Sequence, residues 1–120
     1  MAKKILIIDD DPVVVKYLET LFTDNGYETV SASDANSGFE AVRLENPDLI
    51  TLDLQMPDEW GPRFYRKLSK SDYKDTPVIV ISGISGQHAI KNAVAYVSKP
   101  FDPEKLLGIV QKALKESGQP

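Results

Sequence analysis

Short apolar runs that end on polar residues constrain the fold of this chain more than any other feature. The stretch Asp48–Pro57 holds a nearly continuous apolar run that meets a carboxylate at Asp53. Such a run is typical of a parallel strand that is covered on both faces. Met56-Pro57 then directs the backbone out of the sheet. A carboxylate in this position is costly unless water, a metal ion or a cation contacts it.

Strand-like and helix-like segments alternate along the rest of the chain. The other predicted strands are Ile5–Ile8, Tyr27–Ala32, Val78–Ile81 and Tyr96–Ser98. The predicted helices are one from Pro12 to Asn25-Gly26, one from Asp34 to Asn46-Pro47, one around Phe64 and Leu68, a short one within Gln87–Val94 and a last one after Asp102-Pro103. This alternation predicts an α/β fold, a parallel sheet with helices on both faces.

Turn and cap residues set the expected helix boundaries. Asp11 is the expected N-cap of the first helix, with Pro12 at its first position, and Asp34 can cap the second helix. Gly61-Pro62 predicts a late or distorted start for the third helix. With 120 residues, we expect one domain that covers residues 1–120.

Composition excludes several classes of function. The chain has 14 Lys and Arg against 18 Asp and Glu, a net charge of −4. This balance argues against broad binding to nucleic acids or acidic lipids. The chain has no Cys, which removes disulfides, thiolate zinc sites and Cys nucleophiles. Because no apolar run is long enough for a membrane span or a signal peptide, we expect a cytoplasmic protein.

Five polar residues are predicted to meet at one edge of the sheet, because ligands of open parallel sheets bind beyond the carboxyl ends of the strands. They are Asp9, Asp10, Asp53, Ser82 and Lys99, each at a predicted strand end. If the first and third strands are neighbours, their carboxylates repel by about 3 kcal/mol per pair at roughly 5 Å.

Lys99 supplies one positive charge against three negative ones. A divalent cation would balance the remaining negative charge. Carboxylate oxygens and retained waters suit Mg²⁺. One carboxylate would remain as an oxygen nucleophile for aspartyl-phosphate chemistry, with Lys99 and the metal neutralising the phosphoryl charge. Ser82 could donate a hydrogen bond to that group. Taken singly, each residue also has an ordinary interpretation as a cap, turn or loop residue.

Together these segments resemble the receiver domain of bacterial two-component response regulators. The resemblance rests on Ile5–Pro12, Asp48–Pro57, Pro77–Ser82 and Tyr96–Phe101, and it spans almost the whole chain. It implies a doubly wound, five-stranded parallel sheet of order 2-1-3-4-5, a flavodoxin-like three-layer sandwich. Receiver domains are among the folds that illustrate the strand-end rule used above.

The resemblance also implies the site roles. Asp53 would accept a phosphoryl group from a sensor histidine kinase or a phosphotransfer protein. Asp9, Asp10 and Asp53 would bind Mg²⁺ together with the backbone carbonyl of Gln55, and Lys99 would contact the phosphoryl group. Ser82 and Tyr96 would be switch residues that report phosphorylation, and the downstream protein target stays open. Such a domain is not an enzyme acting on an external substrate, and it binds neither nucleic acid nor a membrane directly.

Two departures from the family pattern stand out. Trp60 precedes Gly61-Pro62 where the family often has an acid. Only Gly83–Ala95 separates the fourth and fifth strands, so a shortened fourth helix is expected.

Two other functions remain open at the level of sequence. A degenerate receiver could act only as a protein-binding module. A metal-dependent phosphatase would need a general acid two residues after the nucleophile, and Gln55 occupies that position.

Overall fold

The computed structural model describes residues 2–54, 60–83 and 93–117. Its five strands form one parallel sheet in the order β2-β1-β3-β4-β5. The strands are β1 (Lys4–Ile8), β2 (Glu28–Ala32), β3 (Leu49–Leu52), β4 (Val78–Ser82) and β5 (Ala95–Ser98). The described helices are α1 (Pro12–Thr23), α2 (Ala35–Glu45), α3 (Trp60–Ser69) and α4 (Pro103–Ser117). The predicted α/β class and strand order are confirmed.

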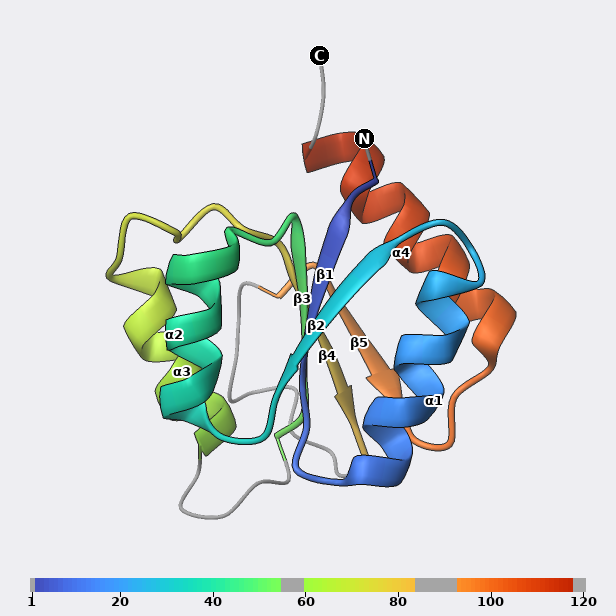
Figure 1. Ribbon diagram of the computed structural model, residues 1–120, viewed down its shortest axis with the longest axis horizontal. Helices are drawn as coiled ribbons and strands as arrows, with labels where there is room; N and C mark the ends of the chain where they lie inside the picture. Colours follow the sequence, from blue (N-terminus) through green and yellow to red (C-terminus); the bar gives the residue numbers. More distant parts are fainter. Residues whose placement is uncertain (1, 55–59, 84–92, 118–120) are drawn as a thin grey trace.

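Helices cover both faces of the sheet, with α2 and α3 on one side and α1 and α4 on the other (Figure 1). Alternate residues of β1 enter opposite cores: Leu6 and Ile8 pack towards α2 and α3, and Ile5 and Ile7 towards α1 and α4. This alternation follows from the two-residue period of a strand. It explains why the central strands are apolar at nearly every position.

The predicted helix caps are confirmed. Asp11 accepts a hydrogen bond from the backbone N–H of Val13 at 2.9 Å, so it caps α1. Asp34 caps α2 in the same way through the N–H of Ser37 at 2.7 Å. These caps satisfy N–H groups that have no partner inside the helix.

The expected delay of the third helix is wrong, because α3 already begins at Trp60. Pro62 therefore lies in the first turn. The N–H groups of a first turn have no acceptor within the helix, so proline removes no hydrogen bond there.

The predicted short helix within Gln87–Val94 falls mostly on residues that the structure does not describe. Its last two residues, Ala93 and Val94, are not helical. The N–H of Val94 donates to the carbonyl of Val78 at 2.9 Å, and β5 follows directly.

At Gly38, helix α2 packs closely against side chains of β1 and α3. A Cβ atom there would lie 2.9 Å from Cδ1 of Ile8 and 3.4 Å from Cε1 of Phe64. We expect Gly38→Val to lower the free energy of unfolding by about 1–3 kcal/mol, because overpacking forces core side chains off their rotamers. Urea denaturation measures the change. Gly108→Val in α4 is the control, since no atom lies within 4 Å of the Cβ position there. An equal loss in both variants would contradict a packing origin.

Candidate functional site

The sheet places Asp9 and Asp53 side by side. Ile8 and Leu52 are register partners in β1 and β3, and each aspartate follows one of them. The ladder continues for one residue past the strands, because the N–H of Asp53 donates to the carbonyl of Ile8 at 3.0 Å. The N–H of Asp9 likewise donates to the carbonyl of Ala32 at 3.1 Å. Both carboxylates are thus held by the regular backbone of the sheet.

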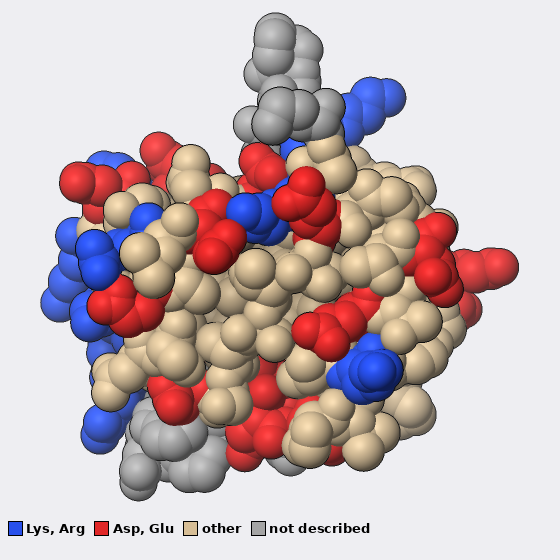
Figure 2. Space-filling view, viewed as in Figure 1, with Lys and Arg blue, Asp and Glu red and all other residues tan. Residues whose placement is uncertain are grey.

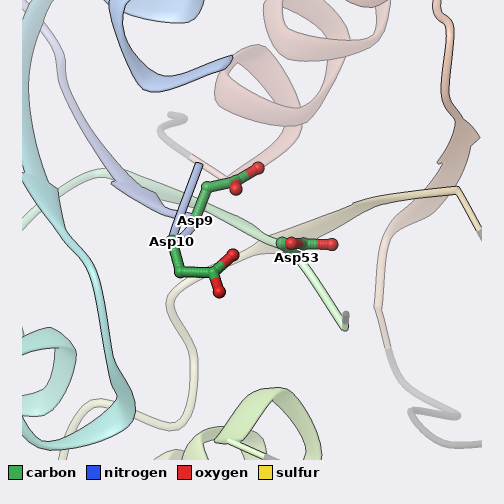
Figure 3. A group of neighbouring side chains, drawn as sticks. All are labelled: Asp9, Asp10 and Asp53. Atoms are coloured by element: carbon green, nitrogen blue, oxygen red, sulfur yellow. The ribbon is translucent and has the colours of Figure 1, made fainter. Parts of the chain in front are cut away.

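Three carboxylates converge at this edge, as Figure 3 shows for Asp9, Asp10 and Asp53. One oxygen from each can be chosen so that all three lie within 4.8 Å of one another. Asp9 and Asp53 are each only 3% exposed, whereas Asp10 is exposed to solvent. Two of the three negative charges are therefore largely shielded from water, which makes a positive partner necessary.

Lys99 supplies positive charge from the loop after β5. Its Nζ donates to Oδ2 of Asp9 at 3.0 Å and lies 3.6 Å from Oδ1 of Asp53. The lysine backbone is fixed as well, because its N–H donates to the carbonyl of Ser82 at 3.0 Å. The Lys99-Pro100 peptide bond is cis. The formal charges of these four side chains, one ammonium and three carboxylates, sum to −2.

The donor set fits a hard divalent cation. Adjacent oxygens around octahedral Mg²⁺ at 2.0–2.1 Å lie roughly 3 Å apart and opposite ones roughly 4 Å apart. The separations within the cluster approach this range, and the cluster offers only oxygen atoms. Oxygen ligands favour Mg²⁺ over softer metals. Asp9, Asp10 and Asp53 would hold such an ion, with the exposed Asp10 on the solvent side.

The other predicted residues occupy different positions. Ser82 ends β4 at the same edge and is 4% exposed. Tyr96 lies in β5 opposite Val80, and its side chain packs against the core on the α2–α3 side. Gln55 lies outside the described residues, so its predicted carbonyl ligand stays a prediction.

A backbone contact was not anticipated. Oδ1 of Asp9 accepts a hydrogen bond from the N–H of Asp11 at 2.9 Å. With Lys99 on its other oxygen, Asp9 is held at both ends of its carboxylate. In an Asx turn, an aspartate side chain accepts from the N–H two residues later in the chain. An aspartate at the start of a strand-to-helix turn is therefore the sequence signal for this contact.

The hydroxyl of Tyr96 is buried and has no hydrogen-bond partner among the residues that the structure describes. Burial also raises the pKa of Tyr96 above its ordinary value of 10.0. We expect Tyr96→Phe to raise the free energy of unfolding by about 1 kcal/mol, because an unsatisfied buried hydroxyl is removed. Because the pKa of Tyr96 is lower in the unfolded chain than in the folded protein, the unfolded chain loses this proton first as pH rises. The free energy of unfolding should therefore fall above about pH 10, and it should fall less in Tyr96→Phe. Urea denaturation at pH 7 and pH 10.5 measures both effects. A variant less stable than the wild type at pH 7 would contradict the idea.

A carboxylate cluster with a lysine at the switch edge of an order 2-1-3-4-5 sheet defines a phosphoacceptor class of α/β protein. The family model for the response regulator receiver domain matches residues 5–111. The chain belongs to this family of two-component signalling domains. Receiver domains generally are phosphorylated with the help of Mg²⁺ and interact with histidine kinases.

Curated relatives and solved structures agree with this assignment. Protein Rrf1 of Nitratidesulfovibrio vulgaris is 37% identical over 116 residues, which are 95% of this chain and 84% of that protein. Sensory transduction protein LytT of Enterococcus faecalis is 35% identical, and the match covers 96% of this chain but only 49% of LytT. A CheY-like receiver domain protein from Methanospirillum hungatei has a TM-score of 0.88 and 27% identity, over 98% of both chains.

Chemotaxis response regulator CheY4 of Vibrio cholerae has a TM-score of 0.84 and 25% identity, over 94% of this chain and 99% of that one. In the described part of the chain, no helix has the length and apolar character that a membrane crossing requires.

Proposed function

We propose that residues 1–120 form a receiver domain in which Asp53 accepts the phosphoryl group. The observation that carries this proposal is the placement of the Asp53 carboxylate, buried beside two further carboxylates and 3.6 Å from the Lys99 ammonium. A nucleophile in a phosphoryl transfer needs positive charge on the side where phosphoryl oxygens arrive. Lys99 lies on that side.

The proposed step is an in-line displacement. An oxygen of Asp53 forms a bond to phosphorus while the bond from phosphorus to the imidazole nitrogen of a histidine kinase breaks. The bonding electron pair remains on that nitrogen, which is neutral or takes a proton from solvent. A bound Mg²⁺ would supply charge neutralisation for the transferring group. Lys99 moves from Asp9 and Asp53 towards a phosphoryl oxygen.

The remaining roles belong to the same proposal. Asp9 and Asp10 hold the metal ion, with Asp53 as a third ligand. Ser82 lies at the adjoining strand end and donates a hydrogen bond to the phosphorylated aspartate. Tyr96 changes rotamer when Ser82 moves, because its hydroxyl has no hydrogen-bond partner in the described part of the chain and costs little to displace. The domain performs this transfer and the slow hydrolysis of its own aspartyl phosphate in the cytoplasm, without turnover of an external substrate.

The test is phosphorylation of the purified chain by acetyl phosphate. With Mg²⁺ we expect the intact mass to rise by one phosphoryl group, and with EDTA we expect no incorporation. The fluorescence of Trp60, the one tryptophan in the sequence, gives a second readout in the presence of beryllofluoride. No mass gain and no Mg²⁺-dependent fluorescence change would contradict the proposal and favour a protein-binding module. Continuous release of phosphate would favour a phosphatase instead.

A further inference from the structure

Helix α3 carries a row of positive side chains on its outer face. The four residues are Arg63, Arg66 and Lys67 within α3 and Lys70, which directly follows its last residue; all four are exposed. Their spacing i, i+3, i+4, i+7 is that of one helix face. Phe64 and Leu68, on the opposite face, are each 1% exposed and pack into the core. We call these four residues the α3 basic stripe.

The stripe is conspicuous because the rest of the chain is acidic. The chain has 14 Lys and Arg and 18 Asp and Glu. Without the four stripe residues, 10 positive charges stand against 18 negative ones, a balance of −8. In Figure 2, blue side chains gather along the left edge, where α2 and α3 lie in Figure 1.

No carboxylate of the described residues neutralises the stripe. Two acids of the neighbouring helix α2 already pair with other cations: Glu40 with Arg43, and Glu45 with Lys4. In residues 2–54, 60–83 and 93–117, Arg63, Arg66 and Lys70 form no ion pair. Like charges at these spacings also weaken a helix.

A purely structural role does not account for the whole stripe. Positive charges in the last turn complement the helix dipole, which explains Arg66 and Lys67. Lys67 is also held by the ring of Phe39, whose centroid lies 4.5 Å from its Nζ. Arg63 is near the start of α3, where a positive charge is unfavourable. Arg63 lines up with the other three positive side chains, as a surface that binds a row of negative charges would require.

We propose that the α3 basic stripe binds an acidic helical segment of a partner protein. Seven residues at 1.5 Å each span about 10 Å, which matches two turns of a helix with carboxylates at the same spacing. An extended polyanion is disfavoured, because a duplex or a membrane would also face the acidic remainder of a molecule of 34 × 32 × 23 Å. A single helix laid along α3 avoids this repulsion. The proposal does not depend on the phosphorylation of Asp53.

The test is fluorescence anisotropy with a labelled alanine-rich peptide of about 20 residues, long enough to form a helix in water. Its glutamates stand at i, i+3, i+4 and i+7, and a second peptide of the same composition spreads them around the helix. The test variant is Arg63→Gln/Arg66→Gln/Lys70→Gln. The matched control, Lys3→Gln/Lys105→Gln/Lys112→Gln, removes three other exposed charges and leaves the same net charge.

We expect the test variant to weaken binding of the first peptide about tenfold and the control less than about twofold, as the loss of several surface ion pairs predicts. Both variants should keep a cooperative thermal transition, because all six residues are exposed. The charge reversal Arg66→Glu/Lys70→Glu leaves two positive and two negative charges in the stripe, so it should remove the difference in affinity between the two glutamate peptides.

Three results would overturn the proposal. The first is equal weakening in the test and control variants, which would mean that net charge alone drives binding. The second is equal affinity for the two glutamate peptides, which would remove the role of spacing. The third is tighter binding to a 20-base-pair duplex, or to vesicles containing anionic lipid, than to the first peptide.

Discussion

Replacing Asp53 by asparagine is expected to abolish incorporation of the phosphoryl group from acetyl phosphate. Asparagine keeps the size of the side chain but removes the negative oxygen that attacks phosphorus. The loss of a nucleophile typically lowers the rate roughly 10³-fold or more. Intact mass spectrometry after a fixed incubation with Mg²⁺ measures the incorporation, and circular dichroism checks that the variant is folded.

The control for this prediction is Asp48→Asn. Asp48 lies at the opposite end of β3, where its Oδ2 accepts a hydrogen bond from the N–H of Lys4 at 2.8 Å. An amide oxygen can still accept that bond, so incorporation should match that of the wild type. If Asp53→Asn is phosphorylated as fast as Asp48→Asn, Asp53 is not the acceptor.

The second large effect is expected for Lys99→Met. The substitution leaves Asp9 and Asp53, each 3% exposed, without the ammonium that lies 3.0 Å from one and 3.6 Å from the other. Removing one partner of a fully buried pair costs about 3–5 kcal/mol. Lys99 keeps 21% of its side chain exposed, so we expect the free energy of unfolding to fall by about 2 kcal/mol without a divalent cation.

Added Mg²⁺ should restore much of this loss. A ligand that binds only the folded state stabilises it by mass action. Without the Lys99 ammonium the carboxylates attract a cation more strongly, so they should bind Mg²⁺ more tightly in the variant. The rise in melting temperature with Mg²⁺ should therefore be larger for Lys99→Met than for the wild type. Lys4→Met is the control, since it breaks an ion pair with Glu45 on the surface. An unchanged melting temperature in Lys99→Met without Mg²⁺ would show that Lys99 does not stabilise the cluster.

The sheet and the location of the site could be predicted because their signals are local. Each strand is a short apolar run, and the residues that end these runs must share one edge of a parallel sheet. The caps at Asp11 and Asp34 depend on only three and four consecutive residues, respectively. The sequence pattern therefore contains what is needed to place Asp9, Asp53 and Lys99 together.

Details that depend on three-dimensional packing could not be predicted. The preference of Lys99 for Asp9 over Asp53 is a difference between 3.0 and 3.6 Å, which depends on rotamers and not on residue order. Helix α3 begins before Gly61-Pro62 and so is not delayed by it. The cost of Pro62 depends on its turn within the helix, and the sequence pattern does not define that turn. The four charges of the α3 basic stripe are present in the sequence, but their lack of ion pairs within the described residues depends on where the helices place the surrounding acids.

The contact between Lys99 and Asp9 also orders events during the folding of the chain. The two residues are 90 positions apart in sequence, and Lys99 follows β5, the last strand to be synthesised. Contacts between such distant residues form late, because the intervening chain must be organised first. A nascent chain with only its first four strands would hold the acids without their cation. Under the proposed chemistry, Asp53 can then be phosphorylated efficiently only when the whole sheet is assembled. Incomplete chains would not accept the phosphoryl group.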